Sequence, residues 1–500
     1  MAFDPPFILA IDQGTTSSRA VIFDSAARPV AQHSLEIRQI YPANGWVEHD
    51  PEEIWQTTLA CCRVAAKGID PNDIVAIGIT NQRETAVLWD RKTGEALHNA
   101  IVWQDRRTAD RCRALKHAGW EARVSATTGL LLDPYFSGTK VEWLLDHIPG
   151  ARARAERGEL AFGTVDSWLV YKLTGGALHA TDVTNASRTL FLNLKSLAWD
   201  DDMLRLLNVP RAVLPEVRSS ADDYGETLPE LLGRAIPIRG VAGDQQAAAF
   251  GQACFTAGDV KSTYGTGCFA LVNTGSAVPA SKNRLLATNA YRAKDRTAYA
   301  IEGSIFIAGA VVQWLRDALG VIRSAAEVEA LAQTAKPADG LYFVPAFTGL
   351  GAPYWDPEAR GVITGLTRDM GAAEIARAAL DSVCFQTRDL LEAMGRDMRE
   401  ADLAAPSALK VDGGMVRNNW FCQRLADLTG LPVERPQVTE TTALGAAYLA
   451  GLSAGLFQDF SDIAKGWALD RRFVPEMSRA VRDALYDGWM QAVARARSDG

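Results

Sequence analysis

The chain has few cysteines for its length, and none of them forms a Cys-x-x-Cys pair. Its 500 residues include seven cysteines, at positions 61, 62, 112, 254, 268, 384 and 422. An odd number without metal-type spacing argues against a disulfide framework or a zinc site, and indicates reduced thiols. The sequence also lacks a basic segment followed by an apolar core, so we expect no signal peptide. These features predict a cytoplasmic protein.

Long apolar runs and blocks of like charge are missing too. No run approaches the ~18 apolar residues that a membrane-spanning helix requires. The net charge is −8 without any Lys/Arg block, so we expect no nucleic-acid partner. Hydrophobic residues make up 48% and charged residues 22%, which is typical of globular proteins. The length suits two domains, and we place them at residues 1–251 and 252–500.

Several common catalytic motifs do not occur in the sequence. Without a Gly-Lys dipeptide there is no Walker A loop, and Gly265-x-Gly267 lacks the third glycine of a dinucleotide-binding fingerprint. There is no His-Glu-x-x-His and no Gly-x-Ser-x-Gly, which argues against a zinc peptidase and a serine hydrolase. A nucleotide would therefore have to be bound in another way.

Residues 8–23 contain the most informative pattern that is present. Two apolar, strand-like runs, residues 7–11 and 18–23, flank the polar segment 12–17, which holds Asp12, Gly14, Thr15, Thr16 and Ser17. Backbone N–H groups and hydroxyls at such a tight turn suit a phosphate. The Asp12 carboxylate suits a Mg²⁺ ion that is held through water. The alternative is a surface hairpin with a merely polar tip.

A second copy of this pattern supports the phosphate-binding interpretation. Residues 259–274 form an extended run, then Gly265-Thr266-Gly267, then an apolar strand. Two such units half a chain apart predict a duplicated architecture that clasps a nucleotide between its halves. The arrangement resembles the actin, hexokinase and heat-shock chaperone ATPase superfamily. We therefore expect an α/β fold of two duplicated, ribonuclease H-like ATPase domains with a cleft between them.

Asp244 is our candidate catalytic base. It follows a predicted strand at residues 238–241, before Gln245 and a helix at 247–251. A carboxylate at a strand end can take the proton of a substrate hydroxyl that attacks a phosphoryl group. The competing interpretation is a helix cap, because Asp is a favoured N-cap residue.

Arg83 and Glu84 follow another predicted strand, residues 74–80. A guanidinium and a carboxylate at a strand end could bind the hydroxyls of a polyol, although a salt-bridged surface pair is the simpler alternative. Trp103, Tyr135 and Phe269 could form an apolar wall for the carbon backbone of a substrate. Aromatic residues are, however, more often ordinary core residues.

Glycines mark a possible site for the nucleotide base. Gly413-Gly414 follows a predicted strand, and the missing side chains leave room for a flat ring. A tight turn is the alternative. Gly309 and Gln313 are one turn apart on a helix that we predict over residues 304–319; they could face the same pocket or reflect helix packing alone. We also predict helices over residues 50–67, 372–394 and 478–497.

Eight motifs together resemble the FGGY carbohydrate kinases. They are DQGTTSSRA (12–20), GWVEHDPEEIW (45–55), ITNQRET (79–85), YFSGTKVEWLLDH (135–147), GDQQAA (243–248), TYGTGCF (263–269), GLTRDMGAAEIARAALDSV (365–383) and VDGG (411–414). The resemblance extends from about residue 8 to residue 460. NQRET, WQDRR (103–107) and GDQQ are similar to the members that act on glycerol, rather than to those that act on xylulose or gluconate.

The resemblance implies ATP-dependent phosphorylation of glycerol to sn-glycerol 3-phosphate, with Asp244 as base and Asp12 holding Mg²⁺. It implies glycerol contacts from Arg83, Glu84, Trp103, Tyr135, Asp244, Gln245 and Phe269. It implies nucleotide contacts from Thr15, Thr16, Ser17, Arg19, Thr266, Gly309, Gln313, Gly414 and Asn418. It further suggests a homo-oligomer, either a dimer or a tetramer.

One segment departs from the family pattern. Residues 224–234 lack the glycine cluster that binds fructose 1,6-bisphosphate in some members, and they contain no histidine. Inhibition by a sugar bisphosphate and activation by histidine phosphorylation are therefore in doubt. The rival hypothesis from another functional class is a non-catalytic or filament-forming actin-like ATPase, which would have no need of a polyol pocket.

Overall fold

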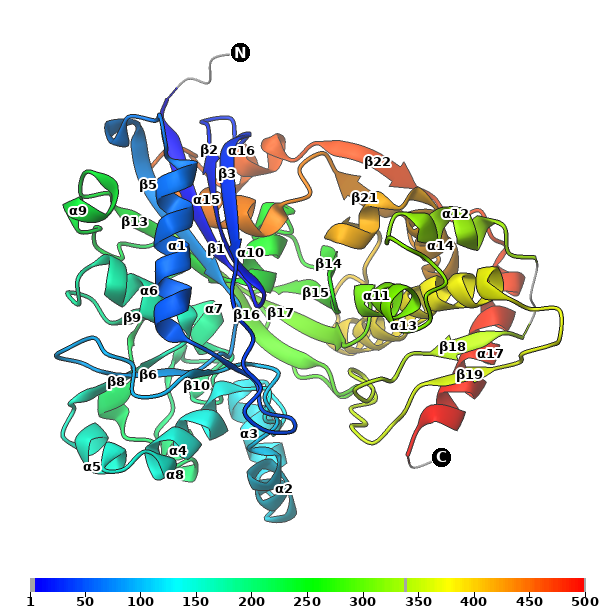
Figure 1. Cartoon of the computed structure of the whole chain (residues 1–500), viewed down its shortest axis with the longest axis horizontal. Coiled ribbons are helices and arrows are strands. Elements are labelled where there is room, and N and C mark those ends of the chain that lie inside the picture. Colours follow the sequence, from blue (N-terminus) through cyan, green and yellow to red (C-terminus); the bar gives the residue numbers. More distant parts are fainter. Residues whose placement is uncertain (1–4, 337–339, 499–500) are drawn as a thin grey trace.

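The computed structural model describes residues 5–336 and 340–498. Two lobes lie side by side in Figure 1, with most of the N-terminal half in one and most of the C-terminal half in the other. Each lobe is built on one mixed sheet with helices on its faces. No helix within the described ranges is long and apolar enough to cross a membrane.

The first sheet has five strands in the order β13-β5-β1-β2-β3, with β5 and β13 parallel to β1. Its strands are β1 (Phe7–Gln13), β2 (Ser17–Phe23), β3 (Pro29–Glu36), β5 (Ile74–Asn81) and β13 (Ile238–Gly243). Alternate residues of β1 enter different cores. Leu9 packs in the core that contains α1 (Pro51–Ala65) and α6 (Val165–Leu173), and Ile8 and Ala10 pack in the core that contains α15 (Thr441–Ser453). This burial on both faces explains the continuous apolar sequence of the strand.

The second sheet has seven strands in the order β16-β17-β15-β14-β20-β21-β22. They are β14 (Val260–Tyr264), β15 (Cys268–Gly275), β16 (Leu286–Ala293), β17 (Arg296–Ile305), β20 (Leu409–Asp412), β21 (Val433–Pro436) and β22 (Leu469–Phe473). Its β17-β15-β14-β20-β21 portion repeats the first sheet: three antiparallel strands, then two parallel to the first of the three. The predicted duplication is confirmed.

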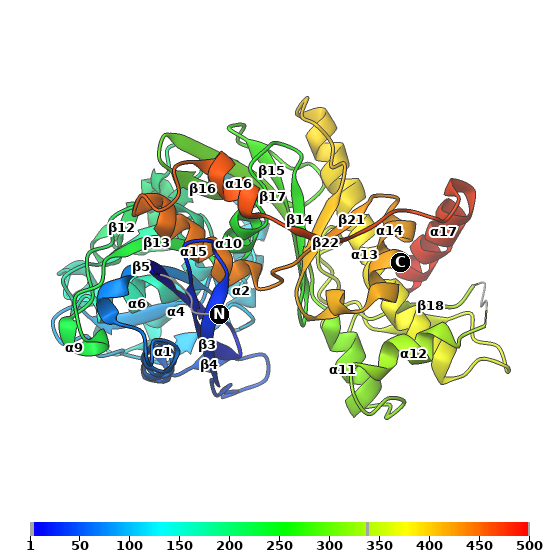
Figure 2. The ribbon, with the colours of Figure 1, turned by 90° about the horizontal axis from the view of Figure 1, so that it is seen from above.

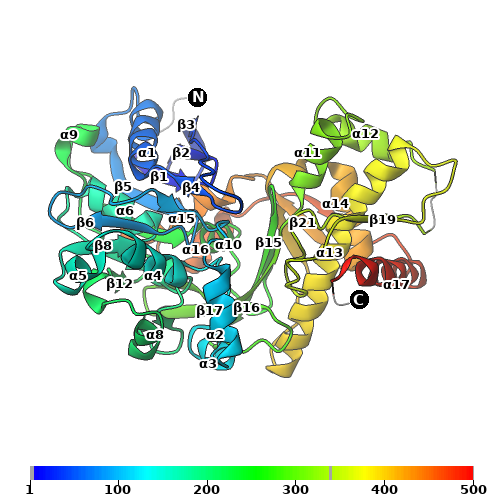
Figure 3. The ribbon, with the colours of Figure 1, turned by 60° about the horizontal axis from the view of Figure 1, so that its bottom comes forward.

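The helices cover both sheets (Figures 2 and 3). In the N-terminal half they are α1 (Pro51–Ala65), α2 (Ala109–His117), α3 (Glu121–Thr128), α4 (Ser137–His147), α5 (Ala151–Glu156), α6 (Val165–Leu173), α7 (Val183–Ala186), α8 (Asp201–Leu206), α9 (Pro229–Leu232) and α10 (Asp244–Gly251). In the C-terminal half they are α11 (Gly309–Asp317), α12 (Glu327–Gln333), α13 (Ala372–Glu400), α14 (Asn419–Thr429), α15 (Thr441–Ser453), α16 (Phe460–Gly466) and α17 (Arg479–Ala496).

Short strands form the remaining sheets, each of two strands. The pairs are β4 (Glu48–His49) with β7 (Ala100–Ile101), β6 (Val87–Asp90) with β8 (Leu160–Gly163), β9 (Ala180–Asp182) with β12 (Glu216–Arg218), β10 (Leu192–Asn193) with β11 (Ala198–Trp199), and β18 (Tyr342–Val344) with β19 (Val362–Thr364).

Most predicted elements are found, but several boundaries differ; α13, predicted to end at residue 394, continues to Glu400. The helix predicted at 304–319 begins only at Gly309, because residues up to Ile305 pair with β15 as the end of β17. The helix predicted at 247–251 already begins at Asp244. Asp50 is the N-cap of α1, where its side chain accepts a hydrogen bond from the Glu52 N–H, as the Asp-Pro-Glu-Glu start predicts.

One helix of the second half, α15, packs on the first sheet. α15 lies between β21 and β22 of the second sheet in the sequence but packs on the first sheet, against β1, β5 and β13, and it also packs along α10. Figure 2 shows α15 beside β5 and α10. The crossing is very close: a Cβ added at Gly445 would lie 1.8 Å from the Ala247 carbonyl oxygen, and one at Gly251 would lie 2.1 Å from the Thr441 carbonyl oxygen. Glycine is required here because backbone meets backbone.

We expect Gly445→Ala to destabilise the protein, since neither backbone can move without separating α10 from α15. The loss should be at least about 2 kcal/mol, within the range of overpacking effects. Gly395→Ala is the matched control, because a Cβ at this position of α13 would meet only the end of the Arg399 side chain at 3.2 Å. That control should be neutral or gain ~0.5–1 kcal/mol of helix propensity. Thermal unfolding of both variants checks this, and equal midpoints would contradict it.

Candidate active site

The carboxyl ends of β1, β5 and β13 meet at one edge of the first sheet. Gln13 pairs with Asn81, and Asn81 pairs with Gly243. The first hairpin, the Arg83-Glu84 segment and Asp244 therefore start from neighbouring strand ends, where ligands bind in open α/β sheets. Gln82 Nε2 links two of them by donating to Gln13 Oε1 at 3.0 Å and to the Gly14 carbonyl oxygen at 3.1 Å.

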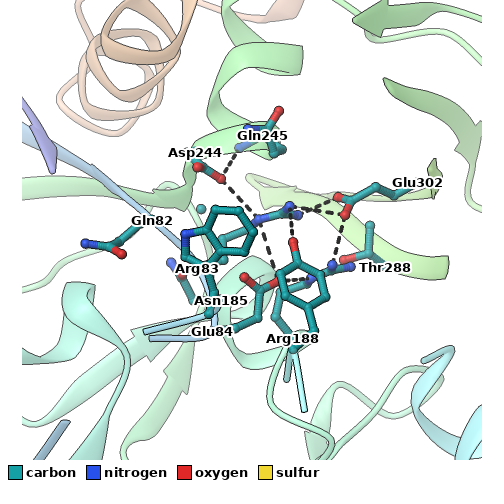
Figure 4. A network of polar contacts seen from close by, with 12 residues as sticks. Gln82, Arg83, Glu84, Asn185, Arg188, Asp244, Gln245, Thr288 and Glu302 are labelled. Carbon is teal, nitrogen blue, oxygen red and sulfur yellow. Dashed lines mark hydrogen bonds and ion pairs between the residues drawn. The ribbon is translucent and has the colours of Figure 1, made fainter. Parts of the chain in front are cut away.

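Arg83 and Glu84 are not a surface salt bridge. The Arg83 side chain is 2% exposed, and its Nε lies 3.1 Å from Asp244 Oδ1 and 3.9 Å from Glu84 Oε1. Glu84 has φ +59°, a left-handed conformation that is uncommon for a residue with a side chain. Strain of this kind clusters at functional sites. Figure 4 shows the two side chains converging with Asp244.

Asp244 is the first residue of α10 rather than its N-cap, which is Gly243. Its side chain is 28% exposed, so it is open to a ligand. Burial of the carboxyl group within the protein raises its pKa to about 6, while the positive charge of Arg83 opposes that rise. A carboxyl group with this pKa is mostly ionised at pH 7 and is a stronger proton acceptor than an ordinary aspartate.

The three aromatic residues form one continuous wall. The rings of Trp103 and Tyr135 meet edge to face with centroids 5.7 Å apart, and those of Trp103 and Phe269 with centroids 6.1 Å apart. Trp103 Nε1 also donates to the Thr15 hydroxyl at 2.8 Å. Phe269 belongs to β15 of the second sheet, so this wall connects the first hairpin with the second.

Gln245 is held by a buried lysine from the second sheet. Lys261 Nζ donates to Gln245 Oε1 at 2.5 Å, to Thr263 Oγ1 at 2.9 Å and to the Phe269 carbonyl oxygen at 3.3 Å. Burial lowers the pKa of Lys261, and the nearby Asp412 carboxylate acts in the opposite direction. Sequence reasoning missed Lys261, although a lysine at an inward position of an apolar strand is a signal that could have been used.

The first hairpin has its free turn at residues 14–16, since Asp12 pairs with Arg19 inside the β1–β2 ladder. Arg19 Nη2 donates to Asp12 Oδ2 at 2.5 Å, and Arg19 Nη1 donates to Glu440. These side chains border a cavity of about 500 Å³ that is also lined by Gly14, Ser17, Gln32, His33 and Ser34. Thr16 is exposed at the tip.

The second hairpin abuts the start of α11. The Gly309 N–H donates to the Gly265 carbonyl oxygen at 2.9 Å, and the Ala308 and Ala310 N–H groups donate to that of Thr266 at 2.9 and 3.0 Å. A Cβ at Gly309 would lie 2.6 Å from the Gly265 oxygen, so only glycine fits. The Thr266 side chain is exposed, and so is that of Gln313 one turn along α11.

The segment after β20 offers room beside the backbone. Gly413 has φ +92°, and a Cβ there would meet the Tyr264 carbonyl oxygen at 2.5 Å. Gly414 has no atom within 4 Å of the place where a Cβ would lie. Asn418 caps α14 by accepting from the Phe421 N–H at 2.7 Å. Open space at Gly414 is compatible with a stacked ring, as the sequence predicts.

A carboxylate beside an open cavity suits Mg²⁺, which usually keeps several waters and binds one or two carboxylates together with nucleotide phosphates. Asp12 and Glu440 both line the cavity here. Asp12 meets this description, and the described residues contain no group of three or more His, Cys, Asp or Glu that could hold a metal alone. The donor set thus fits an ion that arrives with a nucleotide.

Comparison with known proteins agrees with this geometry. Residues 7–251 match the N-terminal domain of the FGGY family of carbohydrate kinases, and residues 260–454 match its C-terminal domain. The chain belongs to the FGGY family of carbohydrate kinases. Its α/β fold of two actin-like ATPase domains is that of the family.

Relatives of this FGGY kinase are similar over almost their whole length. Glycerol kinase 1 of Pseudomonas aeruginosa is 60% identical over 99% of both chains, and the glycerol kinase of Alcanivorax borkumensis is 59% identical over 98% of both. Among solved structures, Plasmodium falciparum glycerol kinase with ADP superposes with a TM-score of 0.92 at 35% identity over 99% of both chains. A gluconate kinase from Lactobacillus acidophilus, with a TM-score of 0.88 at 24% identity, shares the fold.

Two further charged residues of this FGGY kinase lie behind the site and were missed from the sequence. Arg188 follows α7, and Glu302 lies in β17; the side chains of both are 0% exposed. Figure 4 places them beside Arg83 and Glu84. The signal that could have revealed Glu302 is one charged residue inside the apolar run from Ala298 to Ile305.

Proposed function

We propose that this FGGY kinase transfers the γ-phosphoryl group of ATP to a terminal hydroxyl of glycerol, giving sn-glycerol 3-phosphate and ADP. The observation that carries the proposal is a cluster of side chains: the polar groups of Arg83, Glu84 and Asp244 lie together, and Trp103, Tyr135 and Phe269 form a wall of aromatic rings. The hydroxyl groups of glycerol would bind the polar side chains, and its carbon chain would lie on the aromatic rings. The 60% identity to glycerol kinases supports it.

The glycerol site in this proposal consists of Arg83, Glu84, Trp103, Tyr135, Asp244, Gln245 and Phe269. The nucleotide site consists of Thr15, Thr16, Ser17, Arg19, Thr266, Gly309, Gln313, Gly414 and Asn418. Mg²⁺, held by Asp12, would neutralise charge on the phosphates when it is bound. The division at residues 251/252 separates the two halves in this proposal; β13 ends at 243 and β14 begins at 260.

Asp244 takes the proton of the attacking hydroxyl as the new bond from oxygen to the γ-phosphorus forms and the bond to the ADP oxygen breaks. Arg83 and Glu84 hold the hydroxyls so that this oxygen faces the phosphoryl group, which removes most of the entropic barrier. The two hairpins approach each other when the lobes close, and closure excludes water as a competing acceptor.

A substrate panel tests the proposed function. We expect rapid ATP-dependent ADP formation with glycerol, and much lower kcat/KM with xylulose, erythritol and dihydroxyacetone. A coupled assay of ADP release measures all four together with a control that lacks any polyol. ATP hydrolysis that no polyol changes would contradict the kinase and favour the actin-like ATPase.

The cellular setting is part of the same proposal. All seven cysteines are free thiols, which supports a reducing compartment such as the cytoplasm. The family resemblance supports a dimer or a tetramer of identical chains. Light scattering on the purified protein would determine the oligomeric state.

A further inference from the structure

A buried network of ion pairs lies behind the proposed glycerol site, and it includes Arg188 and Glu302. Arg188 and Glu302 contact Arg83 and Glu84, yet their own side chains are 0% exposed and cannot touch a ligand. Arg188 lies just after α7 in the first half, and Glu302 lies in β17 of the second sheet. Figure 4 shows both on the side of Arg83 away from Asp244 and Gln245.

Glu302 uses both of its oxygens on guanidinium groups. Its Oε2 accepts from Arg83 Nη1 at 2.5 Å, and its Oε1 accepts from Arg83 Nη2 at 3.1 Å and from Arg188 Nη2 at 2.8 Å. This bidentate interaction between Glu302 and Arg83 fixes the plane of the Arg83 guanidinium. Only Nε of Arg83 is left to face Asp244 Oδ1, at 3.1 Å.

Arg188 controls the orientation of Glu84 in a similar way. Its Nε donates to Glu84 Oε1 at 2.6 Å, while its Nη2 is held by Glu302. Among the described residues no donor contacts Glu84 Oε2, so that oxygen is free to accept a hydroxyl. The network therefore occupies one face of Arg83 and Glu84 and leaves the other face for a ligand.

We propose that Glu302 and Arg188 are positioning residues for the phosphoryl acceptor: Glu302 holds both Nη atoms of Arg83 so that only Nε faces Asp244, and Arg188 directs Glu84 toward the substrate. The inference rests on the proposed function. It makes the acceptor site depend on β17, a strand of the opposite sheet. Movement of one sheet relative to the other would then change the positions of Arg83 and Glu84.

Glu302→Gln tests the role of the charge. The amide cannot grip both Nη atoms, so Arg83 should turn toward Asp244 and lower its pKa. The charged groups that act on the Asp244 carboxyl are Arg83, Glu84 and Lys261. We expect the acid limb of kcat/KM to move down by about 0.5–1 pH unit, since a full pair with arginine lowers a carboxyl pKa by ~1–3 units. The KM for glycerol should rise about tenfold, with the KM for ATP within twofold of wild type.

Two conservative variants separate position from charge and keep the test valid if the amide variant does not fold. Glu302→Asp retains the charge, so its acid limb should stay in place while its glycerol KM rises. Arg188→Lys keeps one donor, so we expect a glycerol KM raised at least threefold. Asp397→Asn, in a buried carboxylate of α13 that binds residues 281–283, is the control and should change neither quantity.

The results distinguish this inference from the proposed function. A wild-type enzyme that does not phosphorylate glycerol refutes the function before any variant is made. If the wild type is active, the positioning role is overturned by a folded Glu302→Gln variant whose acid limb of kcat/KM lies at the wild-type pH. The same variant would also have a glycerol KM within twofold of wild type. If that variant does not fold, unchanged glycerol KM values in both Glu302→Asp and Arg188→Lys overturn it.

Discussion

Asp244→Asn should reduce kcat at least ~10²-fold, the lower end of what a general base contributes. Asparagine has nearly the same shape as aspartate but cannot take up the proton of the attacking hydroxyl. The pocket around it remains, since Glu302 still holds Arg83 by both Nη atoms. We therefore expect the glycerol Kd, measured by calorimetry, to change by only a few-fold.

The pH dependence of the wild-type enzyme should carry the signature of the same group. Asp244 has a pKa of about 6 because burial disfavours its charged form. The rate should fall about tenfold per pH unit below pH 6 as the base becomes protonated. A pKa raised by folding means that the protein loses stability as pH rises from about 4 through 6. The asparagine variant avoids this loss, so its thermal midpoint at pH 7 should equal or exceed that of wild type.

A matched control distinguishes catalysis from a general effect of the substitution. Asp259→Asn alters a carboxylate in the turn before β14, where it accepts from the Thr256 N–H. This variant should keep wild-type turnover. Near-normal turnover of Asp244→Asn would remove Asp244 from the mechanism, whereas low turnover with a lowered thermal midpoint would indicate damage to the fold instead.

The architecture could be predicted from the sequence where local patterns decide it. β1 and β14 are short runs that end at a glycine-containing polar turn, and such runs indicate strands and turns by themselves. The capped start of α1 at Asp50 is equally local. The crossing of α15 onto the first sheet is different, because it depends on contacts of Gly445 with Ala247, almost 200 residues away in sequence. No periodicity encodes such a contact.

Part of the site could be predicted because local sequence patterns decide where its residues lie. Arg83, Glu84 and Asp244 follow strand ends, and position relative to a strand can be inferred from sequence. Arg188 and Glu302 have no such marker, because a charged residue is usually exposed. Only the folded chain shows that these two buried charges form an ion pair. Neither the resemblance to a family nor the local pattern assigned them a role.

Arg83→Met should be the most destabilising substitution in the site. The buried network holds two guanidinium groups and three carboxylates, Arg83 and Arg188 with Glu84, Asp244 and Glu302. Removing Arg83 leaves the three carboxylates with one arginine partner. Breaking a buried ion pair from one side costs ~3–5 kcal/mol. We expect the thermal midpoint to fall by roughly 10 °C, using ~2–4 °C per kcal/mol for domains of this size.

The double variant Arg83→Met/Glu302→Leu decides whether charge imbalance causes that loss. Replacing both partners of a buried pair by apolar side chains is often neutral or stabilising, and here it restores the wild-type net charge of the network. The midpoint should recover part of its fall; recovery is not complete because Arg188 Nη2 loses its acceptor, Glu302 Oε1. Glycerol turnover should not recover, because the Nε that faces Asp244 is gone in both variants.

The second substitution therefore restores part of the stability but not the activity, and this difference identifies the role of the ion pair between Arg83 and Glu302. If the ion pair between Arg83 and Glu302 existed to stabilise the fold, the double variant would be as unstable as the single one. Recovery of the midpoint without recovery of turnover would mean that the protein keeps a costly buried network because it orients the Arg83 donor. A double variant with near-normal glycerol kcat/KM would exclude Arg83 from the acceptor site.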